Sequence, residues 1–216
     1  MQPSSDTTSS LRRRSNGLRT RAEIIAAAEH HFAERGFQDT RLGDIAAAVG
    51  IRRPSLSYHF AEKHELYTAV IESVFADWWQ ALPNGGGVVE RLESAMGSWV
   101  DFVAERPSAA RLLLRELANV QPERIAALLH SGGAVVRWIE RLIDEGVANG
   151  ELQPRVEPLR FMSLMAAIAG VQFAAIPWLA LRAPVDLQDR EELKTRKQEI
   201  LLLARTLLGY EAPTED

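Results

Sequence analysis

A dense run of hydrogen-bond donors between residues 52 and 59, RRPSLSYH, has the chemistry needed to bind a polyanion. Guanidinium groups bind phosphate oxygens, and they also form paired hydrogen bonds with the edge of guanine. Hydroxyl and imidazole groups add donors that position a protein on a nucleic-acid backbone. The candidate contact residues in this run are Arg52, Arg53, Ser55, Ser57, Tyr58 and His59.

The same residues do not make a convincing catalytic site. Ser55, Ser57 and His59 are close in sequence, but a helix would present them to solvent without a buried carboxylate or an oxyanion hole. The chain has no cysteine, which excludes disulfides and thiolate metal sites and fits a reducing cytoplasm. Its five histidines lack metal-ligand spacing. We therefore expect no catalytic residue, metal or cofactor, although a helical enzyme with unrecognised catalytic groups stays the alternative from another class.

Two short helices would position the donor run. Apolar residues at 42, 45, 46 and 49 line one face of the first helix, and Thr40 precedes it as a candidate N-cap. Gly50 then breaks the pattern, and Pro54 suits the first turn of a second helix over residues 54–59. Leu56 and Phe60 would face the core and leave the donors exposed. Two helices around a glycine turn, the second rich in donors, are typical of a helix-turn-helix DNA reader.

Two longer helices flank this motif. The first is expected from Arg19 to Arg35, with Gly36 ending it in a left-handed conformation. The other is expected from Glu62 to Leu82. Residues 1–17 lack apolar periodicity and are expected to form a disordered arm, whose arginines at 12–14 would either reach DNA or stay solvated.

The segment from Arg19 to Phe75 resembles the DNA-binding domain of the TetR family of bacterial transcriptional regulators. The resemblance covers about a quarter of the chain and is carried by residues of the first helix, the turn and the recognition helix in matching order, namely Thr20, Arg21, Ile24, Ala28, Phe32, Gly36, Phe37, Thr40, Asp44, Ile45, Ala46, Val49, Gly50, Ile51, Leu56, Ser57, Tyr58, His59, Phe60, Lys63 and Leu66. Ser57 and Pro54 depart from the family pattern, which commonly has an aromatic residue and a Gly or Ala there.

The resemblance implies an all-α protein with an N-terminal three-helix helix-turn-helix domain and a C-terminal helical domain for ligand binding and dimerisation. The expected boundaries are 18–66 for the first domain, with its recognition motif at 41–60, then 67–210 for the second, and a tail at 211–216. It also implies that the protein forms a homodimer and that its partner is a double-stranded DNA operator. It adds Thr20, Thr40, Arg41 and Lys63 to the DNA contacts, with Lys63 on a backbone phosphate.

Charge and apolar content agree with this division. Residues 1–66 hold ten basic and eight acidic side chains, whereas residues 67–216 hold fifteen and twenty-one. The excess of positive charge therefore accompanies the helix-turn-helix, as DNA binding requires.

Beyond residue 87 the pattern is helical throughout, with a break expected at Gly132-Gly133 and a kink or end at Pro177. The uncharged stretch 161–181 is read as a buried helix and not as a membrane span, since it is rich in alanine.

The final helix, expected over residues 187–208, carries an apolar stripe that could pack on its own chain. The resemblance instead implies that the last two long helices, around 158–181 and 187–208, pair across a two-fold axis. The expected dimerisation residues are Leu193, Ile200, Leu201, Ala204, Leu207 and Leu208.

Large and soft side chains in the second half suggest an apolar cavity with a few orienting polar groups. The candidate effector residues are Trp99, Phe102, Arg115, His130, Trp138, Met162, Met165, Gln172 and Phe173, with Ser163 as a further polar group. The expected function is a transcriptional repressor that a small, partly apolar effector releases from a palindromic operator. The alternative is a DNA-binding regulator without an effector, controlled by a protein partner.

Overall fold

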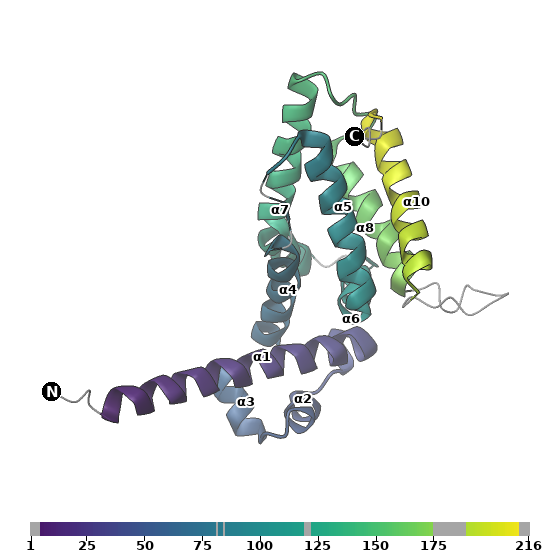
Figure 1. Ribbon diagram of the computed structural model, residues 1–216. Coiled ribbons are helices and arrows are strands. Elements are labelled where there is room, and N and C mark those ends of the chain that lie inside the picture. Colours follow the sequence, from purple (N-terminus) through teal and green to yellow (C-terminus); the bar gives the residue numbers. More distant parts are fainter. Residues whose placement is uncertain (1–4, 81, 84, 119–121, 175–188, 212–216) are drawn as a thin grey trace. The chain divides into compact units, whose positions relative to one another are not determined.

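The computed structural model describes residues 5–80, 82–83, 85–118, 122–174 and 189–211. All regular secondary structure in these ranges is helical (Figure 1). The helices are α1 (Ser5–Asp39), α2 (Leu42–Ala48), α3 (Arg53–His59), α4 (Lys63–Gln80), α5 (Val88–Glu105), α6 (Pro107–Ala118), α7 (Pro122–Ala148), α8 (Pro158–Ala174) and α10 (Arg190–Leu208). The all-α prediction is confirmed, and Pro177 lies outside the described residues. None of the helices in the described ranges is long and apolar enough to cross a membrane.

Internal contacts divide the chain into Met1–Ser73 and Val74–Asp216. The division falls within α4, so this helix contributes residues to both units. It lies seven residues beyond the boundary after residue 66 that the sequence predicts.

The first unit packs α1, α2, α3 and the start of α4 around a small apolar core. Ile24 and Phe32 from α1, Ile45 from α2 and Leu56 from α3 are fully buried. The Phe32 and Tyr67 rings meet edge to face with their centroids 4.9 Å apart, a favoured geometry for aromatic pairs. This core sets the orientation of the two short helices, which are too short to be stable alone.

Helix α1 begins far earlier than expected. It starts at Ser5, so the prediction of a disordered arm is wrong for residues 5–17. A helix already formed over residues 19–35 extends at little cost, because each further residue adds a hydrogen bond without a new nucleation step. Gly36 has φ 79° and interrupts the helix as expected, although a further helical turn follows up to Asp39.

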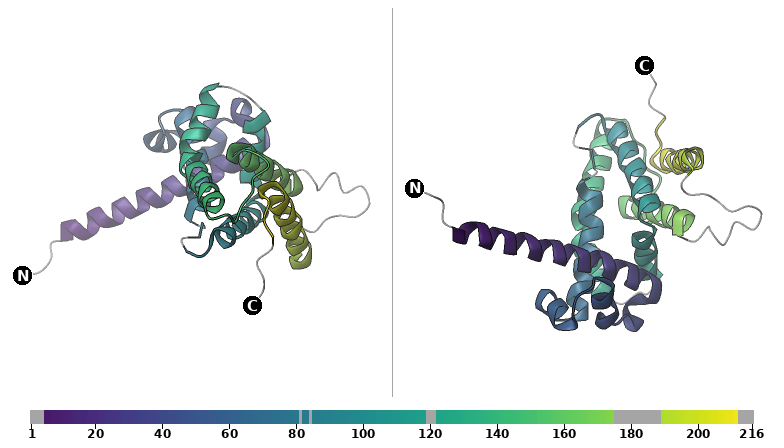
Figure 2. Two further views of the ribbon diagram at one scale, coloured as in Figure 1. Left: turned by 90° about the horizontal axis from the view of Figure 1, so that it is seen from above. Right: turned by 60° about the horizontal axis from the view of Figure 1, so that its bottom comes forward.

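The second unit is a bundle in which α5, α8 and α10 lie side by side, as Figures 1 and 2 show, and α7 packs on α5 and α8. Helix α7 runs through Gly132-Gly133 without the expected break. A glycine within a long helix costs only about 1 kcal/mol relative to alanine. The packing of residues such as Val135, Ile139 and Leu142 in the core keeps the helix continuous.

The end of α10 is tied to the segment between α7 and α8. The backbone N–H groups of Gln153 and Arg155 donate to the carbonyls of Leu208 and Leu207, both at 2.8 Å. Gly209 ends α10 with φ 66°, and a Cβ atom there would lie 2.5 Å from the Gln153 carbonyl oxygen. Only glycine fits this position without strain.

Candidate DNA-binding face and effector pocket

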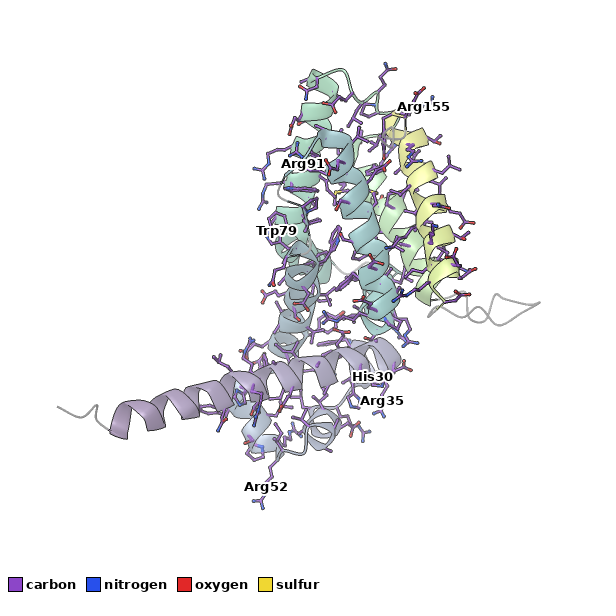
Figure 3. All side chains as sticks on the ribbon, in the orientation of Figure 1. His30, Arg35, Arg52, Trp79, Arg91 and Arg155 are labelled. Carbon is purple, nitrogen blue, oxygen red and sulfur yellow. The ribbon has the colours of Figure 1, made fainter. Side chains whose placement is uncertain are left out.

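Helix α3 presents a polar face beside a fully buried apolar one. Leu56 and Phe60 are completely buried, as the helical spacing predicts. Tyr58 is 87% exposed, and its ring meets His59 edge to face with centroids 5.4 Å apart. The exposed polar residues of this face are Arg52, Arg53, Ser55 and Ser57, and His59 is half-buried. Figure 3 shows Arg52 projecting away from the helices of its unit.

The turn between α2 and α3 is a glycine turn. Gly50 has φ 74°, and the N–H of Ile51 returns to the Ala46 carbonyl at 3.0 Å. Pro54 occupies the first turn of α3, where its missing N–H leaves no hydrogen bond unmade. The helix-turn-helix geometry predicted for residues 41–60 is thus present.

Thr40 does not cap α2, and that prediction is wrong. The N-cap is the exposed Arg41, which makes no side-chain cap hydrogen bond. The Thr40 hydroxyl is buried and lies 2.7 Å from the Gly36 carbonyl and 3.0 Å from the His31 carbonyl. A hydroxyl has one hydrogen to donate, so the two carbonyls share it, and this contact holds the chain where it turns back on the end of α1.

Lys63 is bound to the same junction. Its Nζ donates to the Gln38 carbonyl at 3.0 Å and to the Thr40 carbonyl at 3.1 Å, and it lies 4.6 Å from the centre of the Phe37 ring. An ammonium group has three N–H donors, so two are engaged in holding the loop between α1 and α2. This structural role was not visible in the sequence, because it joins residues more than twenty positions apart.

Two further arginine contacts shape this face. The Arg21 guanidinium lies 4.8 Å from the centre of the Phe60 ring, and Thr20 beside it is half-buried. Arg35 donates to Asp44 at 2.7 Å and so links α1 to α2. Burial, followed by the positive charge of Arg35, lowers the pKa of His31. No group of three or more metal-binding side chains occurs among the residues described.

An apolar pocket of about 180 Å³ lies within the second unit. Its wall includes Phe75 and Trp78 from α4, Trp99 from α5 and Ile139 from α7. The remaining lining residues are Ala95, Met96, Ala110, Leu113, Leu114, Val135, Val136, Leu159, Phe161, Met162, Ser163, Met165, Ala166, Gly170 and Ile200. No charged side chain is among these described lining residues, and the exposed Leu159 and Ser163 place one end of the pocket at the surface.

The candidate effector residues divide into three groups. Trp99, Met162, Met165 and Ser163 line the pocket. Phe102 and Trp138 pack against the core elsewhere, Arg115 is exposed, and Gln172 is not part of the wall. The side chains of His130 and Phe173 lie outside the described residues. The sequence did not single out the contribution of α4 through Phe75 and Trp78.

Two tryptophans on the pocket wall differ in their hydrogen bonding. The Trp78 indole N–H donates to Ser98 Oγ at 3.3 Å, and Ser98 donates in turn to the Ala95 carbonyl. The Trp99 Nε1 atom is buried and has no hydrogen-bond partner among the described residues. The two rings touch, with centroids 4.7 Å apart.

The apolar stripe of α10 packs on its own chain. Ile200, Ala204 and Leu208 are essentially completely buried in the core of the second unit, and Leu193, Leu201 and Leu207 pack partly against it. Ile200, Ala204 and Leu208 are therefore core residues of their own chain, while a place at a dimer interface stays a prediction for the half-buried Leu193, Leu201 and Leu207. Helices α8 and α10 also carry large apolar side chains that are exposed, namely Leu164 and Val171 of α8 and Leu202 and Leu203 of α10.

Two protein-family models match this chain, one in each unit. Residues 24–70 match the model of bacterial regulatory proteins of the tetR family, and residues 85–173 match that of the tetracyclin repressor-like C-terminal domain. The HTH-type transcriptional regulator RutR of Escherichia coli K12 is 26% identical over 163 residues, covering 71% of this chain and 76% of RutR.

Other relatives are more distant or match in part. The HTH-type transcriptional activator FasR of Mycolicibacterium smegmatis is 29% identical over 107 residues. The match covers 48% of this chain and 49% of FasR. The structure of the transcriptional regulator FadR of Bacillus subtilis in complex with stearoyl-CoA has a TM-score of 0.68 at 14% identity, covering 85% of this chain and 96% of FadR. With its helix-turn-helix face and its helical C-terminal unit, this chain belongs to the TetR family and is a DNA-binding transcriptional regulator, not an enzyme.

Proposed function

We propose that this protein is a ligand-responsive repressor, which binds a roughly palindromic operator as a dimer and is released by a small, largely apolar effector. The observation that carries the proposal is the apolar pocket of about 180 Å³ in the second unit. Two of its lining residues, Phe75 and Trp78, belong to α4, whose first residues form part of the DNA-binding unit.

The exposed face of α3 would read the operator. Arg53, Ser55 and Tyr58 would enter the major groove and contact base edges or phosphates, because α3 presents them to solvent. The flanking donors that would hold the backbone are Thr20, Arg41, Arg52, Ser57, His59 and the remaining N–H of Lys63. Thr40 would act indirectly, since its hydroxyl is engaged within the protein.

A second copy of the chain would cover the exposed apolar residues of α8 and α10. Leu202 is 62% exposed, and Leu164, Val171 and Leu203 are each about 40% exposed. Pairing these helices across a two-fold axis would bury the exposed side chains without disturbing the core. A dimer would also supply the two recognition helices that must reach half-sites about 34–36 Å apart.

Release from DNA would be a population shift between two conformations. In one conformation the two recognition helices reach both half-sites, and in the other they do not. A ligand that binds the second conformation more tightly weakens operator binding by the difference between its two binding free energies, typically about 1–3 kcal/mol. Helix α4 is the element through which an occupied pocket would bias the reading head. The FadR structure holds stearoyl-CoA, whose acyl chain is a long hydrocarbon and whose coenzyme A part is charged, so it supports an apolar group of the ligand within this fold.

The experiment begins with an operator selected from random duplexes by the full-length protein. Small apolar compounds are then titrated into the complex, and DNA release is measured by fluorescence anisotropy. The matched variant is Ala166→Phe, which places a ring in the pocket wall at a partly buried position. We expect the variant to bind the operator normally and to resist release.

Two results would contradict parts of the proposal. If no apolar compound releases the protein, regulation through a protein partner becomes the better account. If a reporter gene controlled by the operator loses expression when the protein is deleted, the protein activates transcription, as FasR is named for doing.

A further inference from the structure

Several cations of the first unit are held in place by oxygen atoms of the protein itself. Arg35 donates to Asp44 at 2.7 Å, and the Arg19 guanidinium lies 3.6 Å from the Glu23 carboxylate. Lys63 donates to two backbone carbonyls. The charge of each is therefore balanced by a carboxylate or engaged by the backbone.

Arg21 is held by a different kind of contact. Its guanidinium carbon lies 4.8 Å from the centre of the Phe60 ring, a distance at which the ring attracts a cation. Arg21 is exposed, and it forms no hydrogen bond or ion pair with the residues that the structure describes. An aromatic ring positions a cation without neutralising its charge. The N–H donors of the guanidinium are therefore available to an anion outside the protein.

This charge lies at the end of the recognition helix. Phe60 is the C-cap residue of α3 and directly follows Tyr58 and His59 of the polar face. The Phe60 ring is fully buried, so close packing keeps it in one position and makes it a firm support. Thr20, for which we expect a contact with the DNA backbone, precedes Arg21 in α1. Arg21 is thus beside the helix that DNA approaches.

We infer that Arg21 binds a phosphate of the operator backbone at the edge of the groove that α3 enters, and that the Phe60 ring holds its guanidinium ready for this contact. A guanidinium can give a phosphate two parallel hydrogen bonds. Because the ring already restricts the side chain, less conformational freedom is lost when DNA binds. The contact strengthens binding to all sequences alike, since phosphates carry no sequence information. It concerns DNA binding alone and is independent of the effector pocket.

The variants Arg21→Met and Arg19→Met form a matched pair. Each removes one positive charge from the same part of α1 and keeps an unbranched side chain, but Arg19 is already paired with Glu23. Binding of the full-length variants to an operator selected from random duplexes is measured by fluorescence anisotropy at several salt concentrations. We expect Arg21→Met to weaken binding about tenfold, the effect of losing a hydrogen bond from a charged donor. The log–log salt slope should become shallower by about 0.9 for each bound protomer.

We expect Arg19→Met to change both quantities much less. Equal effects of the two variants overturn the inference, because they would report the general charge of α1 and not a contact of Arg21.

A neutral phosphate analogue identifies the contact itself. Methylphosphonate linkages replace the phosphates of one half-site singly, and each duplex is titrated with the wild-type protein and with Arg21→Met. At the linkage that Arg21 binds, the neutral group should weaken the wild-type protein and leave the affinity of Arg21→Met unchanged. A purely structural role of Arg21 would not produce this non-additivity at a single linkage. If no linkage shows it, the inference is overturned.

Two further variants test the part played by the ring. Arg21→Lys keeps the charge but not the planar fork of donors, so it should retain most of the salt slope and lose part of the affinity. Phe60→Leu stays apolar and offers no ring face, so Arg21→Met should cost less affinity in that background than in the wild-type protein. Arg21→Lys needs no change in the core and decides the matter even if Phe60→Leu does not fold. Wild-type affinity of Arg21→Lys would overturn the role of the fixed guanidinium.

Discussion

Replacement of Lys63 by methionine tests whether this residue holds the loop between α1 and α2 or serves only the DNA. Methionine keeps an unbranched side chain and removes the charge with its N–H donors. The lost contacts are the hydrogen bonds to the Gln38 and Thr40 carbonyls and the position over the Phe37 ring.

The expected cost follows from the exposure of these contacts. A hydrogen bond from a charged donor contributes about 1.5–3 kcal/mol when shielded from water. The bond to the Gln38 carbonyl is exposed, so water replaces most of it, whereas the bond to the Thr40 carbonyl is partly buried. Adding about 0.5–1 kcal/mol for the cation over an aromatic ring gives a loss near 2 kcal/mol. For a chain of this size the melting temperature should fall by about 4–8 °C.

Thermal unfolding and DNA binding must be measured on the same variant. If the third N–H contacts a phosphate, the log–log salt dependence of operator binding should become shallower by about 0.9, equally for all sequences. Lys194→Met is the control, because Lys194 is an exposed lysine on α10. Melting of Lys63→Met at the same temperature as this control would refute the structural role. A changed sequence preference would refute the phosphate contact.

Three further predictions concern the second unit. The pair Leu164→Glu and Leu202→Glu should yield folded monomers in sedimentation velocity with much weaker operator binding, whereas a dimer that persists would place the interface elsewhere. Gly209→Ala should lower the melting temperature more than Gly150→Ala, because both have positive φ but only at Gly209 would the new Cβ meet a backbone carbonyl; equal shifts would argue against the close approach. Burial, followed by the negative charge of a nearby glutamate, raises the pKa of Tyr210 above its ordinary value near 10. The unfolded chain therefore releases that proton first, so urea stability should fall above pH 10. Tyr210→Phe should lessen that fall, and an unchanged decline would mean that other groups cause it.

Local patterns in the sequence were sufficient for the two short helices and the turn of the DNA-binding unit. The apolar spacing of α2, the turn at Gly50 and the burial of Leu56 and Phe60 all concern residues close together in the chain. Such features follow from helical periodicity and the conformational freedom of glycine, and they need no knowledge of distant segments. The starts of α6, α7 and α8 followed in the same way from prolines at 107, 122 and 158.

Composition was a poor guide where a neighbouring helix decided the outcome. Residues 5–17 lack an apolar stripe, yet they continue α1, because extending an existing helix needs no packing partner. Gly132-Gly133 has the composition of a break, yet α7 passes through it, because the core holds the helix on the C-terminal side.

The sequence by itself determined the family, the helical class and the donors exposed on α3, since these depend on residue type and short-range spacing. Only the tertiary structure decided the partners of each side chain. It turned the Thr40 hydroxyl and the Lys63 ammonium onto carbonyls of the first unit. It buried the stripe of α10 in its own core and left Leu202 exposed on the other face. It also left the Trp99 N–H unpaired beside an apolar pocket. A helical stripe shows that a face will be buried, but what covers that face depends on long-range packing that periodicity does not encode.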